Sequence, residues 1–478
     1  MTDPTPTTGR RSAAGERRWD LLVGLAILLP VVVSLCIAVI GREDDTQLGA
    51  RPPATADLSV ASVGCPAAVG ARGLPARATR VPGVPGGRVD VATAPGIQGP
   101  SGKATLTDGG KLSVGPGKSV EVGTDGGVTL LDGRGTAAPG LVAGRSEPLA
   151  VPECRGPSYD EWLVGLGASA RYATSLELVN PDGGDAVVDL EVLGPNGPIE
   201  EPALRGITIP GHGVKRIDLA KVAPRRSATA AHFTVSRGRV VATARSTWDP
   251  LGNGRVTTDF LPSDPEPATD GLILGIPKGA EQTRLAVANP GADEVRVTPQ
   301  IVTPQSVFTP TDAREVAVPP HSLRMISLDA LLSSDAAKGA LGIRVSATGP
   351  VASSVRTLVK DDLVLLGPVP ELAEPTTAVL PAGAKELLLG GATKAGTVQV
   401  QAFDAAGKQV AEKRVEMSEG GAARLALPPK AVSITLTAEN MTVRAMVLIP
   451  ATGRRPGLAT LRLRPAEVRA RIPSVTPR

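Results

Sequence analysis

Three aromatic residues, Tyr159, Trp162 and Tyr172, lie close together in a chain that has few aromatics. Phe, Trp and Tyr make up only 2% of the 478 residues. Aromatic rings provide flat apolar faces on which sugar rings stack, so this cluster is the best candidate for a glycan contact. The alternative is a structural role. Trp162 begins the alternating run WLVGLG, and its indole could fill a core that has few other large side chains.

A second candidate pair is Cys65 and Cys154, which could form a disulfide. The chain has three cysteines, and Cys36 lies inside a long uncharged run, which leaves these two as a pair. Lone cysteines readily bridge in an oxidising compartment. Closing a loop of about 90 residues would stabilise the fold by roughly 4–5 kcal/mol on the chain-entropy model. Two unrelated buried thiols are the alternative.

The remaining polar residues do not form a known catalytic pattern. The three histidines include His212 and His321, which occupy equivalent positions in two sequence repeats and so belong to separate domains. Zinc-protease and serine-hydrolase motifs such as HExxH and GxSxG do not occur in the sequence. Neighbouring carboxylates such as Asp361 and Asp362 could bind calcium or act in glycoside hydrolysis, but acidic turn residues are usually just solvated. We therefore expect no catalytic, metal-binding or cofactor-binding residue, and no enzyme.

The run from Leu21 to Ile40 contains twenty residues without a charge. A helix rises about 1.5 Å per residue, so this run would span roughly 30 Å, the thickness of a bilayer core. Four arginines precede it between positions 10 and 18, whereas residues 43–45 are acidic. Because Lys and Arg favour the cytoplasmic side, we predict a single-pass plasma-membrane protein with its N-terminus inside and its bulk outside.

Two other interpretations of this run are open. A cleaved signal peptide would have a shorter apolar core of about 7–15 residues and a small-x-small site directly after it. The nearest Ala-x-Ala lies downstream, at 54–56. A lipoprotein anchored at Cys36 would need a small residue before the cysteine, where Leu35 stands. We therefore expect an uncleaved anchor and an ordinary thiol at Cys36.

Composition favours many short strands joined by turns. The chain has 55 Gly and 45 Pro, and its 42% hydrophobic content is too high for a disordered protein. The formal net charge is +4, and both signs are interspersed along the sequence. This balance gives no reason to expect a nucleic-acid partner.

The exported part contains a repeat of about one hundred residues. LELVNP at 176–181 matches LAVANP at 285–290, and IPGHGVKRIDL at 209–219 matches VPPHSLRMISL at 318–328. Both matches have an offset of 109 residues (289 − 180 and 321 − 212). Each unit closes on a segment that ends in arginine, VVATAR at 240–245 and VASSVR at 351–356. A third copy begins with LPAGAKE at 380–386, and a degenerate fourth ends with LVAGR at 141–145.

Alternation with period two, interrupted by Gly and Pro, predicts six or seven short strands in each unit. We predict a mostly β protein with an N-terminal transmembrane helix followed by tandem immunoglobulin-like antiparallel β-sandwiches, with a large-bladed propeller as the rival architecture. The predicted segments are residues 1–20 (cytoplasmic tail), 21–40 (transmembrane helix), 41–57 (linker), 58–155 (degenerate N-terminal β domain with hairpins), 156–266, 267–372 and 373–463 (β-sandwich repeats), and 464–478 (flexible Arg- and Pro-rich tail).

The anchor, the Cys65-Pro66 dipeptide at the first strand and the LxxxNP repeats with arginine-ended closing strands together resemble an uncharacterised family. This is a family of actinobacterial secreted or membrane-anchored β-sandwich-repeat proteins, a domain of unknown function. The resemblance covers most of residues 55–463. It implies a fold and brings no catalytic residues.

These observations predict a non-catalytic structural or interaction protein of the bacterial cell envelope. Its expected partners are the lipid bilayer, through residues 21–40, and an envelope protein or glycan. The alternative function is a glycan-binding accessory protein in cell-wall or polysaccharide assembly. A third possibility is an extracytoplasmic hydrolase, which would need carboxylates from distant turns to come together.

Overall fold

The computed structural model describes residues 54–69, 88–93, 102–106, 109–124, 126–146, 150–252, 254–264, 266–311, 313–451 and 456–472, and five positions between 26 and 32. Apart from those five positions, the expected transmembrane helix at 21–40 lies outside the described residues, as does most of the expected linker. No helix among the residues described is long and apolar enough to cross a membrane. By internal contacts the chain divides into two compact units, residues 57–469 and residues 1–56 with 470–478.

Two short strands near the ends of the described chain pair with each other. β1 (Ala54–Asp57) and β35 (Arg469–Ile472) form a two-stranded sheet. The sequence predicts a linker at 41–57 and a flexible tail from Arg464 onward. The described end of the linker and the described start of the tail instead form strands, because each backbone supplies hydrogen-bond partners for the other.

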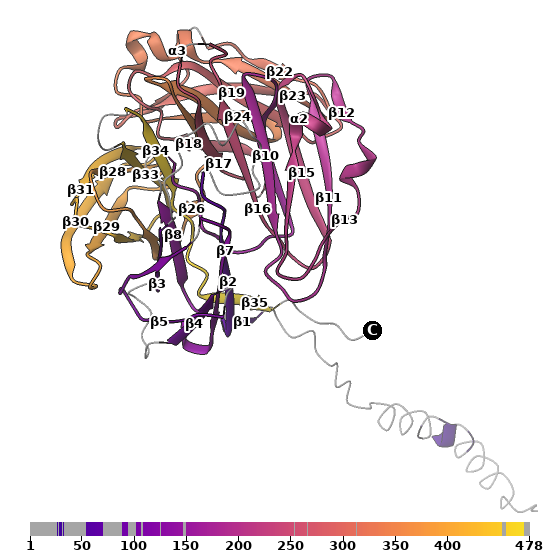
Figure 1. Ribbon diagram of the computed structural model, residues 1–478, viewed down its shortest axis with the longest axis vertical. Coiled ribbons are helices and arrows are strands. Elements are labelled where there is room, and N and C mark those ends of the chain that lie inside the picture. The colour runs from indigo at the N-terminus through magenta and orange to yellow at the C-terminus, as the bar shows by residue number, and fades with distance from the viewer. Residues whose placement is uncertain are drawn as a thin grey trace, which may run out of the picture. The chain divides into compact units, whose positions relative to one another are not determined.

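Residues 57–469 consist almost entirely of antiparallel strands, as the predicted mostly β class requires. The strands form four consecutive sets, repeats I to IV, which Figure 1 shows in order of colour along the chain. Repeat I contains β2 (Val60–Cys65), β3 (Arg88–Thr93), β4 (Gly102–Leu106), β5 (Lys111–Val114), β6 (Val120–Gly123), β7 (Thr129–Arg134) and β8 (Leu141–Ser146). Repeat II contains β9 (Asp160–Ala168), β10 (Tyr172–Val179), β11 (Ala186–Gly194), β12 (Gly197–Ile199), β13 (Ile207–Ile209), β14 (Val214–Asp218), the short helix α2 (Leu219–Val222), β15 (Arg226–Arg237), β16 (Val241–Trp248) and β17 (Thr257–Leu261).

The two later repeats follow the same order. Repeat III contains β18 (Ala268–Leu274), β19 (Glu281–Asn289), β20 (Val295–Val302), β21 (Val307–Phe308), β22 (Val316–Val318), β23 (Ser322–Ser327), helix α3 (Asp329–Ser333), β24 (Gly342–Val359) and β25 (Asp362–Leu366). After β26 (Glu371–Leu372), repeat IV contains β27 (Thr376–Val379), β28 (Lys385–Gly390), β29 (Gly396–Phe403), β30 (Gln409–Met417), β31 (Ala422–Leu427), β32 (Ser433–Glu439), β33 (Val443–Pro450) and β34 (Leu458–Arg462).

All four repeats, including the most degenerate one, share the same central strand pairings. One sheet forms where two strands flank a third: β2 and β4 flank β7, β9 and β11 flank β15, β18 and β20 flank β24, and β27 and β29 flank β32. In the other sheet the second strand of each repeat is central. It is β3 between β6 and β8 in repeat I, β10 between β14 and β16 in repeat II, β19 between β23 and β24 in repeat III, and β28 between β31 and β33 in repeat IV. In repeat III the long strand β24 belongs to both sheets, because its first part pairs with β18 and its second part pairs with β19.

The immunoglobulin-like order is not confirmed by this pairing. In an immunoglobulin domain the first strand joins the sheet of the second, and the seventh joins that of the third and sixth. Here β9 pairs chiefly with β15, and β16 pairs with β10, so the first and seventh strands have exchanged sheets. Alternation in the sequence reports which face of a strand is buried, and it does not report the pairing partner.

The two sheets of each repeat enclose an apolar core. In repeat II, Leu163 of β9, Leu176 of β10 and Phe233 of β15 are all fully buried in one cluster. Burying a side chain of this size contributes on the order of 2 kcal/mol. Comparable clusters occupy repeats I, III and IV, so each repeat is a two-layered sandwich.

The LxxxNP motif places a buried asparagine between two loops. The Nδ2 group of Asn289 donates to the carbonyls of Asp293 (2.7 Å), Val318 (3.0 Å) and Pro319 (3.2 Å). Asn180 makes the matching contacts with Gly184, Ile209 and Pro210. Both side chains are fully buried. The motif therefore fixes the loop after one strand against the turn before another, in addition to starting a turn.

Neighbouring repeats pack together at a glycine that has no room for a side chain. Three of these glycines occupy matching sequence positions within SVGC, LVGL and ILGI: Gly64 and Gly165 lie in the first strand of their repeat, and Gly275 directly follows it. A Cβ would lie 2.9 Å from Val241 if added to Gly64, 2.8 Å from Ser354 if added to Gly165, 2.5 Å from Met446 if added to Gly275, and 2.9 Å from the Val379 carbonyl if added to Gly144. These contacts join repeats I to II, II to III, III to IV and IV back to I, so the order of contacts is cyclic.

The arginine that ends the closing segment docks a repeat on the preceding one. Arg245 donates to the carbonyl of Ala67 in repeat I (2.7 Å). Arg356 donates to the carbonyl of Ser227 in repeat II (3.1 Å), and its guanidinium lies 3.6 Å from the ring centre of Tyr172. The repeated arginine is thus an inter-repeat contact.

Replacing Asn289 with alanine would leave three carbonyls, including that of the buried Val318, without their shared donor. We expect the free energy of unfolding to fall by about 3 kcal/mol, measured by urea denaturation. Asn196→Ala, at an exposed turn position, is the control and should change stability by less than about 0.5 kcal/mol. Similar small changes for both variants would show that the asparagine contacts are dispensable.

Candidate functional site

A cluster of buried charged side chains lies where the connections between repeats meet. Arg462, the last residue of β34, is only 1% exposed and binds the carboxylate of Glu153 with two hydrogen bonds. Arg462 Nε lies 2.6 Å from Glu153 Oε1, and Nη2 lies 3.0 Å from Oε2. Glu153 belongs to the connection between repeats I and II. A bidentate pair of this kind is among the strongest polar contacts in proteins.

The same guanidinium also reaches the two other connections. Arg462 Nη1 donates to the carbonyl of Pro368 (2.6 Å), between repeats III and IV, and Nη2 donates to the carbonyl of Ser263 (2.9 Å), between repeats II and III. Arg464 Nε adds a contact of 2.9 Å with Glu153 Oε2. One side chain thus contacts all three inter-repeat connections. We call Arg462, Arg464 and Glu153 the hub.

A second buried ion pair lies beside the hub. Arg155 pairs with Glu161 of β9, and both side chains are at least 94% buried. Arg155 Nη2 also donates to the carbonyl of Ala242 in β16 (2.6 Å). The backbone of Arg155 bridges to Gly64 of β2, so this residue ties repeat I to repeat II.

Burial and charge shift the pKa values of these carboxyl groups in different directions. Burial raises the pKa of Glu153, but Arg462 and Arg464 outweigh it and lower the pKa to about 2. Burial is likewise outweighed at Glu161, where Arg155 lowers the pKa. At Asp264, burial raises the pKa to about 6, and Arg462 offsets only part of the effect. Both glutamates are therefore ionised partners of arginine at neutral pH.

A cavity of about 450 Å³ opens next to the hub. Its walls come from β2, β8, β27, the connection at 153–158 and the segment 461–467. Most of the wall is apolar, including Ala61, Val63 and Leu141, while Arg155, Glu161 and Arg464 make one side polar. A cavity of this volume is in the range of small-ligand and peptide sites.

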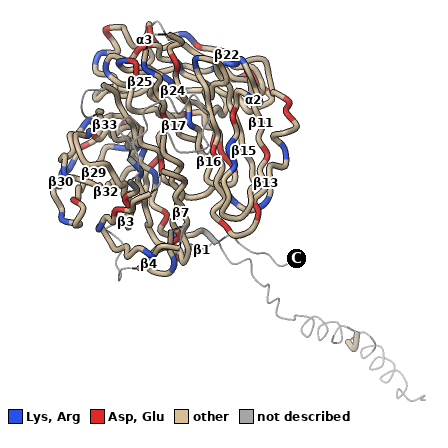
Figure 2. Tube along the Cα trace, in the orientation of Figure 1, with Lys and Arg blue, Asp and Glu red and all other residues tan. Residues whose placement is uncertain are grey.

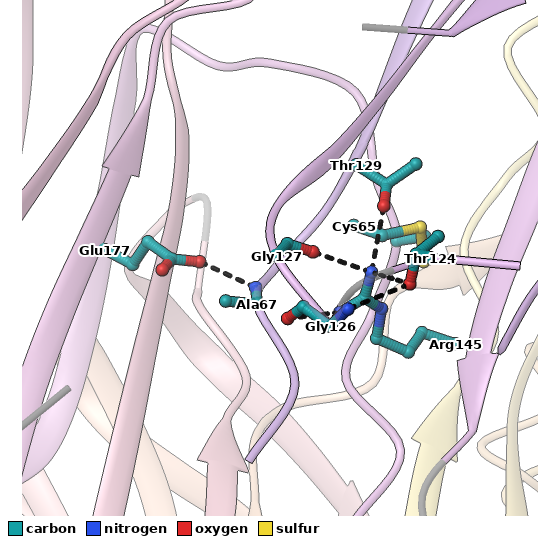
Figure 3. The surroundings of a disulfide bond; sticks show 9 residues. Cys65, Ala67, Thr124, Gly126, Gly127, Thr129, Arg145 and Glu177 are labelled. Carbon is teal, nitrogen blue, oxygen red and sulfur yellow. Dashed lines mark hydrogen bonds between the residues drawn. A yellow bond between two sulfur atoms is a disulfide. The ribbon is translucent and has the colours of Figure 1, made fainter. Parts of the chain in front are cut away.

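Cys65 and Cys154 are joined by a disulfide with an S–S distance of 2.04 Å. The bond ties the end of β2 to the connection that carries Glu153. Figure 3 shows the neighbouring Arg145, whose buried side chain donates to the Gly127 carbonyl (2.8 Å) and the Thr129 hydroxyl (2.9 Å). The disulfide is therefore set in a dense polar network within repeat I.

The structure does not bring the three aromatic residues together as one platform. Trp162 is 5% exposed, because it stacks on His232 (ring centres 4.3 Å apart) and packs against repeat III. Tyr172 is half-buried under Arg356, and Tyr159 is 62% exposed. The proposed sugar platform lacks its central ring. The structure supports the core role for Trp162.

The histidines and paired carboxylates have separate local partners. His212 and His321 are turn residues with positive φ, and His232 Nε2 lies 2.7 Å from Asp160 Oδ1. Asp182 binds Arg239 (2.9 Å). Across the part of the chain that the structure describes, no three potential metal ligands come together.

Sequence reasoning missed the hub because its members are far apart. Arg462 and Glu153 are separated by 309 positions and each lies next to Pro- or Leu-rich sequence that suggests a linker. The sequence pattern predicts a flexible tail that begins at Arg464, one of the hub residues. The one available signal was the unusual sequence LRLR at 461–464, which spans the end of β34.

Glu153→Gln would leave two clustered guanidinium groups without their shared carboxylate. We expect the free energy of unfolding at pH 7 to fall by about 3 kcal/mol, measured by urea denaturation. Glu439→Gln is the matched control, since it breaks a largely exposed pair with Arg414 and should cost less than about 1 kcal/mol. Equal losses in the two variants would rule out a special role for the hub.

Stability should also depend on pH through two buried carboxyl groups, Glu153 and Asp362, whose pKa values are shifted in opposite directions. The pKa of Glu153 is lower in the folded chain, so its contribution is present above about pH 4.5 and is lost towards pH 2. Burial raises the pKa of Asp362 to about 7, so its contribution is present below about pH 4 and is lost as the pH rises to 7. The free energy of unfolding should therefore peak at mildly acidic pH. Asp362→Asn should flatten the decline towards pH 8 in denaturation series, and an unchanged decline would contradict this assignment.

Comparison with known proteins identifies a family for this chain. No curated protein matches it in sequence. One family model, described as a family of unknown function (DUF5719), matches residues 132–428, from the end of β7 to the turn after β31. This match covers more than half of the chain and includes repeats II and III completely. The chain therefore belongs to the DUF5719 family of unknown function.

Proposed function

We propose that the protein is a membrane-anchored, extracytoplasmic interaction protein of the bacterial cell envelope, without catalytic activity of its own. The observation that carries this proposal is the Cys65–Cys154 disulfide, because such bonds persist in oxidising compartments and are rare in reducing ones. The uncharged run at 21–40 and its arginine-rich flank would supply the anchor. An actinobacterial origin, suggested by the family resemblance, is part of the same proposal.

The buried charged side chains are bound to other groups of the protein, which favours a binding role over a catalytic one. The donors of Arg462 contact Glu153 and two backbone carbonyls, so they stabilise the fold and are not directed at a reacting atom. Lys385, another buried charged group, donates to the carbonyls of Gly383 (2.7 Å) and Pro429 (3.2 Å). Figure 2 shows positive and negative residues interspersed along the strands, which suits recognition by shape and backbone more than by net charge.

The two alternative functions have less support. A glycan-binding role relied on Trp162, which is buried between repeats II and III. A hydrolase with two carboxylates needs one of them to be a general acid with a raised pKa. Two of the three glutamates that line the cavity, Glu153 and Glu161, have lowered pKa values.

The proposed location can be tested by labelling cysteines in intact cells. Lys338→Cys, at an 81% exposed side chain, should react with a membrane-impermeant maleimide before lysis. Ser12→Cys, in the expected cytoplasmic tail, is the matched control and should react only after lysis. Labelling of Ser12→Cys but not Lys338→Cys in intact cells would reverse the proposed orientation.

The same Lys338→Cys variant tests the interaction role. A cysteine-directed photo-crosslinker attached outside the cell should join the protein to a defined envelope component, identified by mass spectrometry. A chain that stays uncrosslinked in its native host would contradict a partner-binding role near this surface.

A further inference from the structure

Repeat I lacks the last strand that the other three repeats have. In repeats II, III and IV this strand pairs along the outer edge of the seventh strand: β17 on β16, β25 on β24 and β34 on β33. In repeat I the sheet ends at β8, in the order β6-β3-β8. No strand among the described residues pairs with the outer edge of β8. Within the described part of the chain, one of the four equivalent positions therefore has no strand.

The cavity beside the hub lies at this vacant position. Leu141, Val142 and Ala143 of β8 line it in succession. Residues 61–63 of β2 and 377–379 of β27 form two further walls, and these strands also end their own sheets. Three sheet edges thus face one cavity of about 450 Å³. An exposed strand edge presents unpaired N–H and C=O groups that can accept another strand.

The described part of the connection after β8, from residue 150 onward, is held elsewhere. Glu153 is bound to Arg462, and Val151 packs in the core cluster of repeat IV. The same connection is fixed to β2 by the disulfide at Cys154. These contacts hold it away from the β8 edge and leave the cavity between them.

We propose that this cavity binds an extended peptide segment of a partner protein, which adds to β8 as the missing strand. The strands at the equivalent positions, DLVLL in β25 and LATLR in β34, indicate the chemistry: a short run of mainly aliphatic residues. The apolar walls suit such side chains, and the backbone supplies the hydrogen bonds of strand addition. Arg155, Glu161 and Arg464 make one side polar and would set the direction of the segment.

The occupant must be short. At Gly144 a Cβ would lie 2.9 Å from the carbonyl of Val379, so β27 packs tightly against β8 at this residue. Only residues 141–143 line the cavity, so it accepts on the order of three to five residues in extended form. This inference deepens the proposed interaction role and rests on it.

The test uses a fluorescein-labelled peptide with the β25 sequence DLVLL between flanking lysines, and the purified full-length protein checked for an intact disulfide. We expect saturable binding by fluorescence polarisation and slower hydrogen exchange at the amides of β8. Val142→Trp fills the cavity and should weaken binding about tenfold or more. Lys413→Trp, on the exposed edge strand β30, is the control for non-specific edge binding and should leave affinity unchanged.

The variants must first show unfolding midpoints close to that of the parent. If Val142→Trp fails this check, Val142→Arg and the exchange pattern of the parent decide the question. Absence of saturable binding, equal affinity for the parent and the cavity variant, or protection at β30 instead of β8 would overturn the inference. The peptide test is independent of location in the cell, so its failure is distinguishable from failure of the cysteine-labelling and crosslinking tests.

Discussion

The side chain of Arg462 contacts every connection between repeats, and the rest of the main unit is arranged around this contact. A guanidinium that is 1% exposed is tolerated because Glu153 supplies both carboxylate oxygens and the carbonyls of Ser263 and Pro368 accept further hydrogens. Gly367 contributes by having no side chain, since a Cβ there would lie 3.0 Å from Arg462 Nη1. The three connections can therefore meet at one buried point.

The difference between repeat I and the others follows from this arrangement. In repeats II to IV the chain runs back along the edge of the seventh strand before leaving the repeat. In repeat I the equivalent connection brings Glu153 to the hub and Cys154 to Cys65, so it does not pair with β8. The same contacts that close the cyclic order of repeats thus leave one strand edge and one cavity open. Stability and the potential binding site have a common origin.

Much of the fold could be predicted from sequence, but little of the site could. The 109-residue offset indicated a repeated chain. The alternation of apolar and polar residues indicated strands, because alternate residues of a strand are buried. Strand pairing could not be predicted in the same way, so the exchange of first and seventh strands relative to an immunoglobulin fold was missed. The LxxxNP asparagine was recognised as a turn residue, although its three long-range carbonyl partners were not visible. The hub was hidden because Arg462 and Glu153 are 309 positions apart, in segments whose composition suggests a linker and a tail.

Arg462 couples all four repeats through their connections. Hydrogen exchange measured by mass spectrometry on the Arg462→Met variant tests it most directly, since the uncharged side chain has similar length. We expect faster exchange at 150–158, 262–264 and 367–370 and at the contact between β8 and β27, with the cores of the repeats still protected. Faster exchange confined to the neighbourhood of residue 462 would contradict it, because the distant connections would then be held by other contacts.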